Sequence, residues 1–339
     1  MKYRRVGDTD LEVSEIAFGC GGNAGLMVRG SAAEQERIVG RALDLGITYF
    51  DNSPDYGNCA AEENLGRALK SLRARPLLNS KVEIRAANLG DVADHVVRST
   101  EESLTRLGAD YLDMMQIHNG PSHADPKLEG KVYAQLQIDH YLRPGGAIEG
   151  VRRLLDAGKI RYAGFICRGN DADEVRTILD TGLFKLINVP YTLLNPTGGM
   201  AKPAGLKVGK DYGNVIGLAR DRKASAAIYS PLASGALTDD ALAAKPRHEL
   251  ARAEDPQSDK AVQNREKAKA MRFLANETGI TFAQAAFRFI LMNPGVATAL
   301  GGFSAQAQME EIAAVPDMGP FDASLMARLE AVWNADFRA

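Results

Sequence analysis

The stretch SLTRLGADYLDMMQIH (residues 103–118) contains the helix-to-strand transition on which the predicted fold depends. It continues a helical pattern from residue 93, in which Val96, Leu104 and Leu107 lie near one face and Gly108 ends the helix. Residues 111–118 are then almost continuously apolar, which is typical of a strand buried on both faces. The same succession of helix and buried strand recurs along the chain.

Eight short apolar runs rich in Ile, Val, Tyr, Phe or Leu follow one another in this way. They are EIAFG (15–19), ITYFDNS (47–53), LLNSKVEI (77–84), YLDMMQIH (111–118), IRYAGFIC (160–167), LINVPYT (186–192), SAAIYSPL (225–232) and VATALGG (296–302). Helical patterns between them include residues 32–46, 93–108, 147–159 and 172–182. Eight strand–helix pairs predict a parallel (β/α)8 barrel. We expect one domain over residues 1–339, with an N-terminal hairpin and an extra C-terminal helix.

An open, doubly wound sheet is the alternative α/β architecture. Such a sheet usually carries a GxGxxG turn after its first strand, and FGCGGN at residues 18–23 does not fit that spacing. The last helical pattern, residues 321–337, holds the single tryptophan, Trp333. We expect this helix to pack outside the barrel or near its mouth.

Composition excludes several classes of protein. The net charge is −2, so no overall positive field points to nucleic acid or an anionic membrane. Cys20, Cys59 and Cys167 are an odd number and form no CxxC pair, which favours a reducing, cytoplasmic location without disulfides or zinc. The N-terminus lacks the apolar core of a signal peptide, and no apolar run approaches the length of a membrane helix.

Three long segments follow predicted strands and should emerge at the carboxyl end of the barrel, where binding loops collect. They are residues 119–146, 193–211 and 233–263. We expect the substrate to lie among them. Their aromatic and imidazole side chains are His123, Tyr133, His140 and Tyr141, with Tyr191 just before the second segment. We assign none of these to a binding site, because most polar loop residues are simply solvated.

Four polar residues lie at or just beyond strand ends in the first half of the chain: Asp51, Tyr56, Lys81 and His118. Each has an ordinary structural interpretation on its own, since strand-end tyrosines and histidines are usually packing residues. Lys81 differs, because a lysine inside a buried strand needs a partner, and Asp51 on the neighbouring strand would supply it. Adjacent strand ends of a barrel converge, so these four side chains could meet at one site.

Two motifs that contain these residues resemble signatures of the aldo-keto reductase family. FDNSPDYG (50–57) is similar to FDTAxxYG, and SLTRLGADYLDMMQIH is similar to SLxRLGxDYxDLxxxH. GKIRYAGF (158–165) and AIYSPLASGAL (227–237) match further family segments, so the resemblance runs from about residue 1 to 335. For the catalytic lysine, the family's TKV aligns with residues 80–82, which preserves Lys81, or with residues 86–88, which leaves no lysine; we favour the first.

The resemblance implies an NAD(P)-dependent reductase or dehydrogenase that acts on an aldehyde, ketone or sugar. Tyr56 would donate a proton to the oxygen of a carbonyl that accepts hydride. The ammonium of Lys81, held by Asp51, would lower the pKa of Tyr56 from its ordinary value near 10. His118 would orient the substrate oxygen.

The resemblance also implies a nicotinamide dinucleotide that lies across the barrel mouth. Tyr229 would stack on the nicotinamide ring, and other residues would border the carboxamide, the pyrophosphate and the adenosine. The implied cofactor residues are Gly21, Asp51, Asn188, Tyr229, Ser230, Leu232, Gly235, Gly302, Ser304, Gln308 and Glu311.

The chain departs from the family pattern at three points on the cofactor side. Ile166 and Cys167 stand where the family has Ser-Asn, and Asn188 stands where it has glutamine. The segment GGFSAQAQMEE (301–311) has no lysine or arginine to bind a 2′-phosphate. The family pattern favours NADP(H) and this local chemistry favours NAD(H), so the cofactor preference stays open.

Two other functions are compatible with a barrel. The first is a non-catalytic cofactor-binding barrel that acts as a redox sensor or as a subunit of a larger assembly; the altered carboxamide residues favour it, and the Lys81–Tyr56 pair opposes it. The second is a metal-dependent hydrolase. With five histidines and no HxH or HExxH cluster, the spacing of metal ligands is missing, so we predict no metal site.

Overall fold

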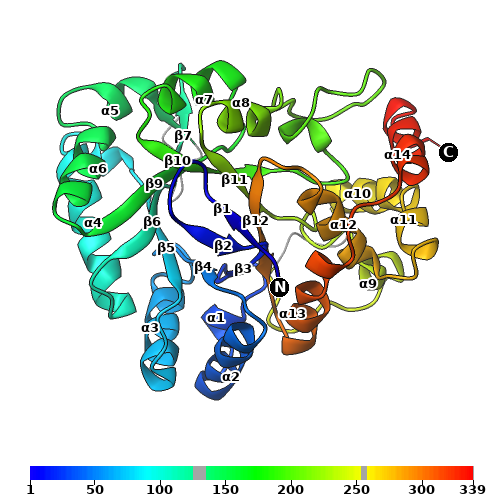
Figure 1. The fold of residues 1–339 in the computed structure, drawn as a ribbon, viewed down its shortest axis with the longest axis horizontal. Coiled ribbons are helices and arrows are strands. Elements are labelled where there is room, and N and C mark those ends of the chain that lie inside the picture. The colour runs from blue at the N-terminus through cyan, green and yellow to red at the C-terminus, as the bar shows by residue number, and fades with distance from the viewer. Residues whose placement is uncertain (125–134, 253–257, 339) are drawn as a thin grey trace.

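The computed structural model describes residues 1–124, 135–252 and 258–338, and it contains a closed barrel of parallel strands surrounded by helices (Figure 1). Around the barrel the strands are β3 (Ile16–Gly19), β4 (Tyr49–Asp51), β5 (Leu77–Val82), β6 (Leu112–Ile117), β9 (Ile160–Ile166), β10 (Phe184–Pro190), β11 (Ser225–Tyr229) and β12 (Val296–Gly302). Parallel pairing of β12 with β3 closes the ring. The predicted (β/α)8 barrel is therefore confirmed, and the open-sheet alternative is wrong.

Helices alternate with the barrel strands and cover their outer face (Figure 1). They are α1 (Leu26–Arg29), α2 (Ala32–Asp44), α3 (Ala60–Leu72), α4 (Val92–Leu107), α5 (Ile138–Leu142), α6 (Ala147–Asp156), α7 (Ala172–Leu179), α8 (Val215–Asp221), α9 (Asp239–Leu242), α10 (Asp259–Lys269), α11 (Phe273–Asn276), α12 (Phe282–Leu291), α13 (Gln306–Ala313) and α14 (Ala323–Asn334). Short 3-10 turns occupy Ala86–Asn88, Pro196–Gly198 and Val315–Asp317.

Local sequence explains where the predicted helices begin and end. Ser31 caps the N-terminus of α2, because its hydroxyl accepts from the backbone N–H of Glu34 while the Glu34 carboxylate accepts from the backbone N–H of Ser31. Gly46 follows α2 with φ of +79°, and Gly108 ends α4 with φ of +64°. Glycine adopts this left-handed backbone conformation without steric cost, so both predicted stops are correct.

The N-terminal hairpin closes the bottom of the barrel. Its strands, β1 (Tyr3–Arg5) and β2 (Glu12–Ser14), pair antiparallel, as predicted. Val6, Leu11 and Val13 are fully buried and pack against the residues that fill the barrel interior. The guanidinium of Arg4 donates to the backbone oxygens of Asn293 and Val296 at 3.1 and 2.8 Å. These contacts join the N-terminal hairpin to the residues at the start of β12.

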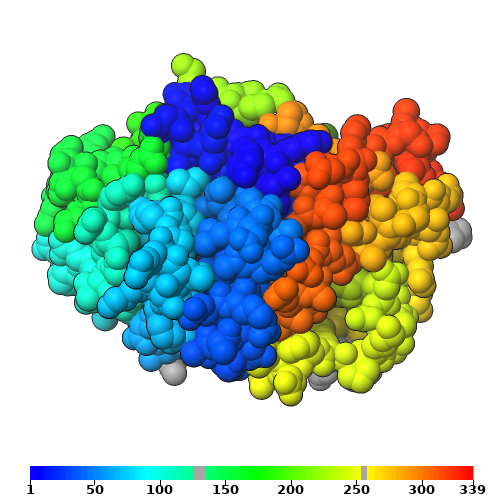
Figure 2. Space-filling view, turned by 60° about the horizontal axis from the view of Figure 1, so that its bottom comes forward, coloured from blue at the N-terminus to red at the C-terminus, as the bar shows by residue number. Residues whose placement is uncertain are grey.

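The three long segments after β6, β10 and β11 lie at the opposite end of the barrel. The first adds a small parallel sheet that the sequence did not predict, formed by β7 (Gly120–Ser122) and β8 (Gln135–Gln137). Residues 244–252 of the third segment, here called the strap, cross to the loop after β3. The backbone N–H of Arg252 donates to the oxygen of Asn23 at 2.8 Å, and the Arg29 guanidinium donates to the oxygen of Leu250 at 3.0 Å. Figure 2 shows the strap region, in yellow, meeting the blue segment that contains α1 and α2.

The aromatic and imidazole residues of the long segments differ in burial, and the two described tyrosines belong to the core. Tyr141 is fully buried and donates to the backbone oxygen of Asn119, and Tyr191 is buried in the main core. His123 is exposed and His140 is half-buried, while Tyr133 lies outside the described residues.

The C-terminal helix α14 packs against the loop that follows β10, as predicted for a helix near the barrel mouth. The Trp333 indole N–H donates to the backbone oxygen of Leu193 at 2.8 Å, and its ring contacts Phe289 of α12 with the ring centres 5.6 Å apart. In the part of the chain that the structure describes, no helix has the length and apolar character to cross a bilayer.

Truncating a side chain of the hairpin should destabilise the whole barrel. Leu11 is 1% exposed inside the barrel floor. Leu11→Ala should lower the free energy of unfolding by about 2–5 kcal/mol, because it leaves a cavity in a packed core. Urea unfolding at equilibrium measures the loss. Leu142→Ala on α5, where the side chain is 47% exposed, is the matched control and should change stability by less than about 0.5 kcal/mol. An equally small effect at Leu11 would contradict this role for the hairpin.

Candidate active site

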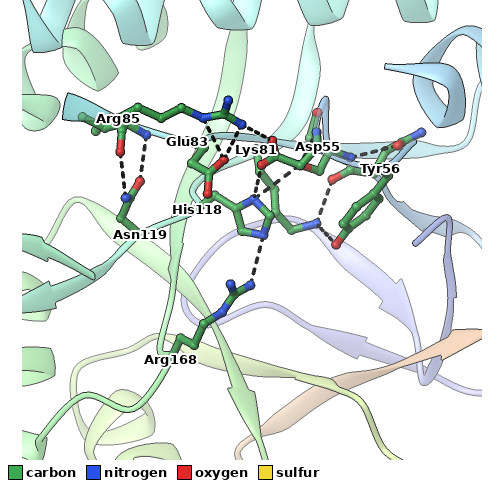
Figure 3. Close-up of polar contacts among 12 residues, drawn as sticks. Asp55, Tyr56, Lys81, Glu83, Arg85, His118, Asn119 and Arg168 are labelled. Atoms are coloured by element: carbon green, nitrogen blue, oxygen red, sulfur yellow. Dashed lines mark hydrogen bonds and ion pairs between the residues drawn. The ribbon is translucent and has the colours of Figure 1, made fainter. Parts of the chain in front are cut away.

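Four side chains from neighbouring strand ends meet at the barrel mouth around the Lys81 ammonium (Figure 3). Asp51 ends β4, Lys81 lies in β5, His118 follows β6 directly, and Tyr56 lies in the loop after β4. The Lys81 Nζ donates to Asp51 Oδ2 at 2.8 Å, to the backbone oxygen of Asn52 at 2.7 Å and to the Tyr56 hydroxyl at 3.1 Å. The structure thus brings together all four residues that the sequence predicted.

These three bonds use all the donors of a lysine ammonium. Burial alone lowers the pKa of Lys81, but the Asp51 carboxylate and the Tyr56 hydroxyl outweigh it, so the pKa lies above its ordinary value. Asp51 is held in turn, because the Asn79 amide donates to its Oδ1 at 2.6 Å. The contact between Lys81 and Tyr56 also supports the alignment that places the family's lysine at residue 81.

The net pKa of Tyr56 differs from the sequence-based expectation. Burial raises it, the Lys81 ammonium opposes this, and the result lies above the ordinary value. Lys81 thus acts on the pKa of Tyr56 in the expected direction, but desolvation of the phenolate outweighs this positive charge. Since Lys81 donates to the Tyr56 oxygen, the tyrosine keeps its own O–H proton for another acceptor. This is the form that a proton donor needs.

His118 is buried between two charged side chains. Its Nδ1 lies 3.2 Å from Asp55 Oδ2, and its Nε2 lies 3.5 Å from Nη2 of Arg168. Burial, assisted by the positive charges of Lys81 and Arg168, lowers the pKa of His118 to about 4 despite the contact with Asp55. The imidazole is therefore neutral at physiological pH.

A cluster of charged residues behind His118 escaped the sequence analysis. The Arg85 guanidinium donates from Nη2 to Asp55 Oδ1 at 2.7 Å and to Glu83 Oε2 at 2.8 Å (Figure 3). His118 and the hydrogen bond from Glu83 lower the pKa of Asp55 to about 2 against burial, while burial and Asp55 raise that of Glu83 to about 7. The alternation of Glu83 and Arg85 just past β5 was the one sequence signal that could have indicated it.

A cavity of about 950 Å³ opens above the Lys81 group. The four predicted catalytic residues and every predicted cofactor residue line it. The latter are Gly21, Asp51, Asn188, Tyr229, Ser230, Leu232, Gly235, Gly302, Ser304, Gln308 and Glu311. One continuous space therefore connects Tyr56 with the start of α13, and it is large for a ligand pocket.

The residues that depart from the family pattern have distinct environments. Ile166 lines the cavity, whereas Cys167 is fully buried in the core and its backbone N–H donates to the oxygen of Asn188 at 2.7 Å. The Asn188 side-chain oxygen accepts from the Gln116 amide at 2.7 Å. Arg168 lines the cavity, and its backbone N–H donates at 2.7 Å to Asn170, which is buried and does not line it.

Basic side chains reach the cavity from segments other than 301–311. Lys245, Arg247 and His248 of the strap and Arg265 of α10 line it. Within 301–311 the polar residues have internal partners. The Gln308 side-chain oxygen accepts from the backbone N–H of Ser304 at 2.9 Å, and Glu311 accepts from the hydroxyl of Thr281.

Among the described residues, no group of three His, Cys, Asp or Glu side chains is arranged to hold a metal ion.

Comparisons with known proteins match nearly the whole chain to aldo-keto reductases. The model of the family described as "Aldo/keto reductase family" matches residues 15–334. An aldo-keto reductase from Bacillus subtilis is 26% identical over 93% of this chain and 88% of its own length. A probable voltage-gated potassium channel subunit beta from Arabidopsis thaliana is 25% identical over 94% and 92%. A crystal structure of an aldo/keto reductase from Klebsiella pneumoniae in complex with NADP and acetate has a TM-score of 0.70 at 22% identity, covering 99% of this chain and 97% of that one.

The raised pKa of Glu83 should appear in the pH dependence of stability. Because the folded pKa, about 7, exceeds the ordinary value of 4.5, the stabilisation is complete below about pH 4.5 and is lost as the pH rises through about 7. The melting temperature of the wild type relative to Glu83→Gln should therefore fall by roughly 3–6 °C between about pH 5 and pH 8. Thermal melts across this range measure it. Glu102→Gln on the exposed face of α4 is the control, and an equal slope there would refute the assignment.

Proposed function

The chain belongs to the Aldo/keto reductase family, and from this we propose that it is an NAD(P)H-dependent oxidoreductase that interconverts a small carbonyl compound and its alcohol, with Tyr56 as the proton donor. The substrate would be an aldehyde, a ketone or a sugar. The observation that carries the proposal is the Lys81 ammonium, which joins the Asp51 carboxylate to the Tyr56 hydroxyl on the floor of the cavity.

The reaction follows from the chemistry of a carbonyl group. A nicotinamide cofactor supplies or accepts hydride when it is bound. The carbonyl oxygen gains negative charge as hydride arrives, so a proton donor is needed within hydrogen-bond reach. Tyr56 retains its proton because burial raises its pKa, and its oxygen is oriented by the bond from Lys81. Once Tyr56 gives up the proton, the adjacent ammonium stabilises the phenolate.

The residues around the cavity fit an extended dinucleotide. The cavity is continuous from Tyr56 to the N-terminus of α13, and Tyr229 presents an aromatic ring in its wall. A Cβ on Gly21 would lie 3.9 Å from the Tyr56 ring, and one on Gly302 would lie 3.2 Å from Cβ of Ala24, so glycine keeps the wall open at both places. We infer that Tyr229 stacks on the nicotinamide and that Asn188 contacts the carboxamide, since Ile166 offers it no hydrogen bond.

We propose NADPH as the preferred cofactor. The sequence argument for NADH depended on the absence of cations in residues 301–311, but Lys245, Arg247, His248 and Arg265 line the same cavity from elsewhere. A 2′-phosphate is a dianion, and charge-assisted hydrogen bonds from arginine are the interactions that favour its binding.

A non-catalytic barrel is the second candidate, because one relative is a probable potassium channel subunit beta with an identity close to that of the reductase relative. The chain keeps a lysine–tyrosine pair that proton transfer needs and cofactor binding alone does not. Measured turnover therefore separates the two functions.

Removing the Tyr56 hydroxyl should abolish proton donation and leave cofactor binding nearly intact. We expect Tyr56→Phe to lower kcat by about 10²–10⁴-fold, the usual contribution of general acid catalysis. Steady-state kinetics on a panel of aldehydes, ketones and sugars measures kcat, and fluorescence titration measures the Kd for NADPH. Tyr3→Phe on the 49% exposed hairpin tyrosine is the matched control. Undiminished turnover by Tyr56→Phe would exclude the proton-donor role.

Cofactor preference should depend on the basic residues of the strap and α10. We expect kcat/KM to be at least about tenfold higher with NADPH than with NADH. Arg247→Ala and Arg265→Ala should each lower the value for NADPH by about tenfold and that for NADH by much less, because NADH has no 2′-phosphate. Arg220→Ala on the exposed face of α8 is the control. Equal losses with both cofactors would show that these arginines do not recognise the phosphate.

A further inference from the structure

The two ring nitrogens of His118 contact side chains with opposite hydrogen-bonding capacity. We propose that Asp55 is a positioning residue that holds His118 as the Nδ1–H tautomer, so that Nε2 presents a lone pair, and no proton, to the cavity. The tautomer follows from the contacts of the ring. Its consequence for substrate binding rests on the proposed function.

The contact at Nδ1 requires a proton on that nitrogen. Asp55 Oδ2 lies 3.2 Å away, and an ionised carboxylate can only accept hydrogen bonds. Asp55 is kept ionised by Arg85, which donates to its other oxygen at 2.7 Å, and its low pKa, about 2, agrees. Ser53 Oγ is farther from Nδ1, at 3.4 Å, and a hydroxyl can accept from an Nδ1–H as readily as it can donate, so it does not oppose this tautomer. Asp55 is therefore the partner that decides the state of Nδ1.

The contact at Nε2 leads independently to the same tautomer. Its neighbour is Nη2 of Arg168 at 3.5 Å, and a guanidinium has donors only. A proton on Nε2 would point at this positive group, whereas a lone pair is attracted by it. A doubly protonated ring is disfavoured by burial and by the charges of Lys81 and Arg168. Figure 3 shows the ring between Asp55 on one side and Arg168 on the other.

The acidic partner of Asp55 does not compete for His118. Glu83 shares Arg85 with Asp55, and its own pKa is raised to about 7. When Glu83 is protonated, Asp55 remains the anion of the pair, and when Glu83 ionises, Arg85 still contacts both carboxylates. The negative charge opposite Nδ1 thus persists across neutral pH.

This tautomer determines which side chains can donate a hydrogen bond to the substrate oxygen. A lone pair at Nε2 cannot donate to a carbonyl oxygen, so the donors available there are the Tyr56 hydroxyl and the Arg168 guanidinium, which both line the cavity. The Nε2 lone pair instead accepts from the Arg168 guanidinium and helps to hold it at the cavity wall. Arg168 would therefore contact the reacting oxygen, a role that the sequence analysis gave to His118.

The tautomer can be measured directly on the full-length protein labelled with 15N at histidine. Two-bond 15N–1H correlation spectra at about pH 7.5 distinguish a protonated from an unprotonated ring nitrogen, and His118→Gln identifies the His118 signals. We expect Nδ1 to be protonated and Nε2 unprotonated. An Nε2–H signal for His118 in the wild type would overturn the proposal.

Variants then test the cause and the consequence. Asp55→Ala removes the acceptor and should shift His118 toward the Nε2–H tautomer. If the alanine variant does not fold, the isosteric Asp55→Asn should do the same, because Arg85 requires the amide oxygen on its own side and leaves the amide N–H to donate to Nδ1. Asp94→Ala, an exposed aspartate on α4 paired with Arg153, should change nothing. An unchanged His118 tautomer in a folded Asp55 variant would refute the positioning role.

A kinetic readout tests the role of Arg168. Arg168→Met should lower kcat/KM for carbonyl reduction by at least about tenfold, the loss expected for one charge-assisted hydrogen bond, while the His118 tautomer stays Nδ1–H. Full activity in Arg168→Met would refute the donor role. Because the spectra need no turnover, an inactive wild type would contradict the proposed function while leaving the tautomer assignment standing on its own measurement.

Discussion

The buried ammonium of Lys81 is the constraint on which the active-site end of the barrel depends. A lysine that is 1% exposed is costly unless its charge is compensated and all its donors are used. Asp51, the backbone of Asn52 and Tyr56 meet both conditions. These partners can surround one lysine only if β4 and β5 are adjacent and parallel and the loop after β4 turns back over them. The charge therefore fixes the position of the Tyr56 hydroxyl, the proposed proton donor.

Burial also sets the direction of the pKa shifts of three other titratable groups in the site. Burial raises the pKa of Tyr56, lowers that of His118 and raises that of Glu83. Tyr56 and His118 are thereby neutral at neutral pH, next to ions that stay charged, whereas Glu83 titrates near neutral pH. Fixed charges that are already in place around a site reduce the rearrangement that the protein undergoes when charge develops there.

The fold and the Lys81 group could be predicted from sequence because they depend on local patterns. Apolar runs marked all eight barrel strands, and Asp51, Tyr56 and His118 stand inside recognisable motifs. Asp55 could not be found in this way, since a carboxylate before a tyrosine has no special meaning until a histidine from β6 lies beside it. Arg168 stands just beyond the altered pair Ile166-Cys167, but its direction could not be predicted, because it depends on how Asn170 folds the loop after β9. The direction in which Lys81 shifts the pKa of Tyr56 could be predicted, whereas the larger opposing effect of burial could not, because the sequence does not show how deeply the tyrosine is buried.

The way in which the strap is held leaves its side chains free to change by mutation. On its own side, the hydrogen bonds that join it to Asn23 and Arg29 use main-chain atoms, the oxygen of Leu250 and the N–H of Arg252. Main-chain groups are the same for almost every residue type. The side chains of the strap that face the cavity can therefore be exchanged by mutation while the closure itself is kept. Ligand selectivity at this wall can drift over evolutionary time separately from the proton-transfer chemistry on the barrel floor.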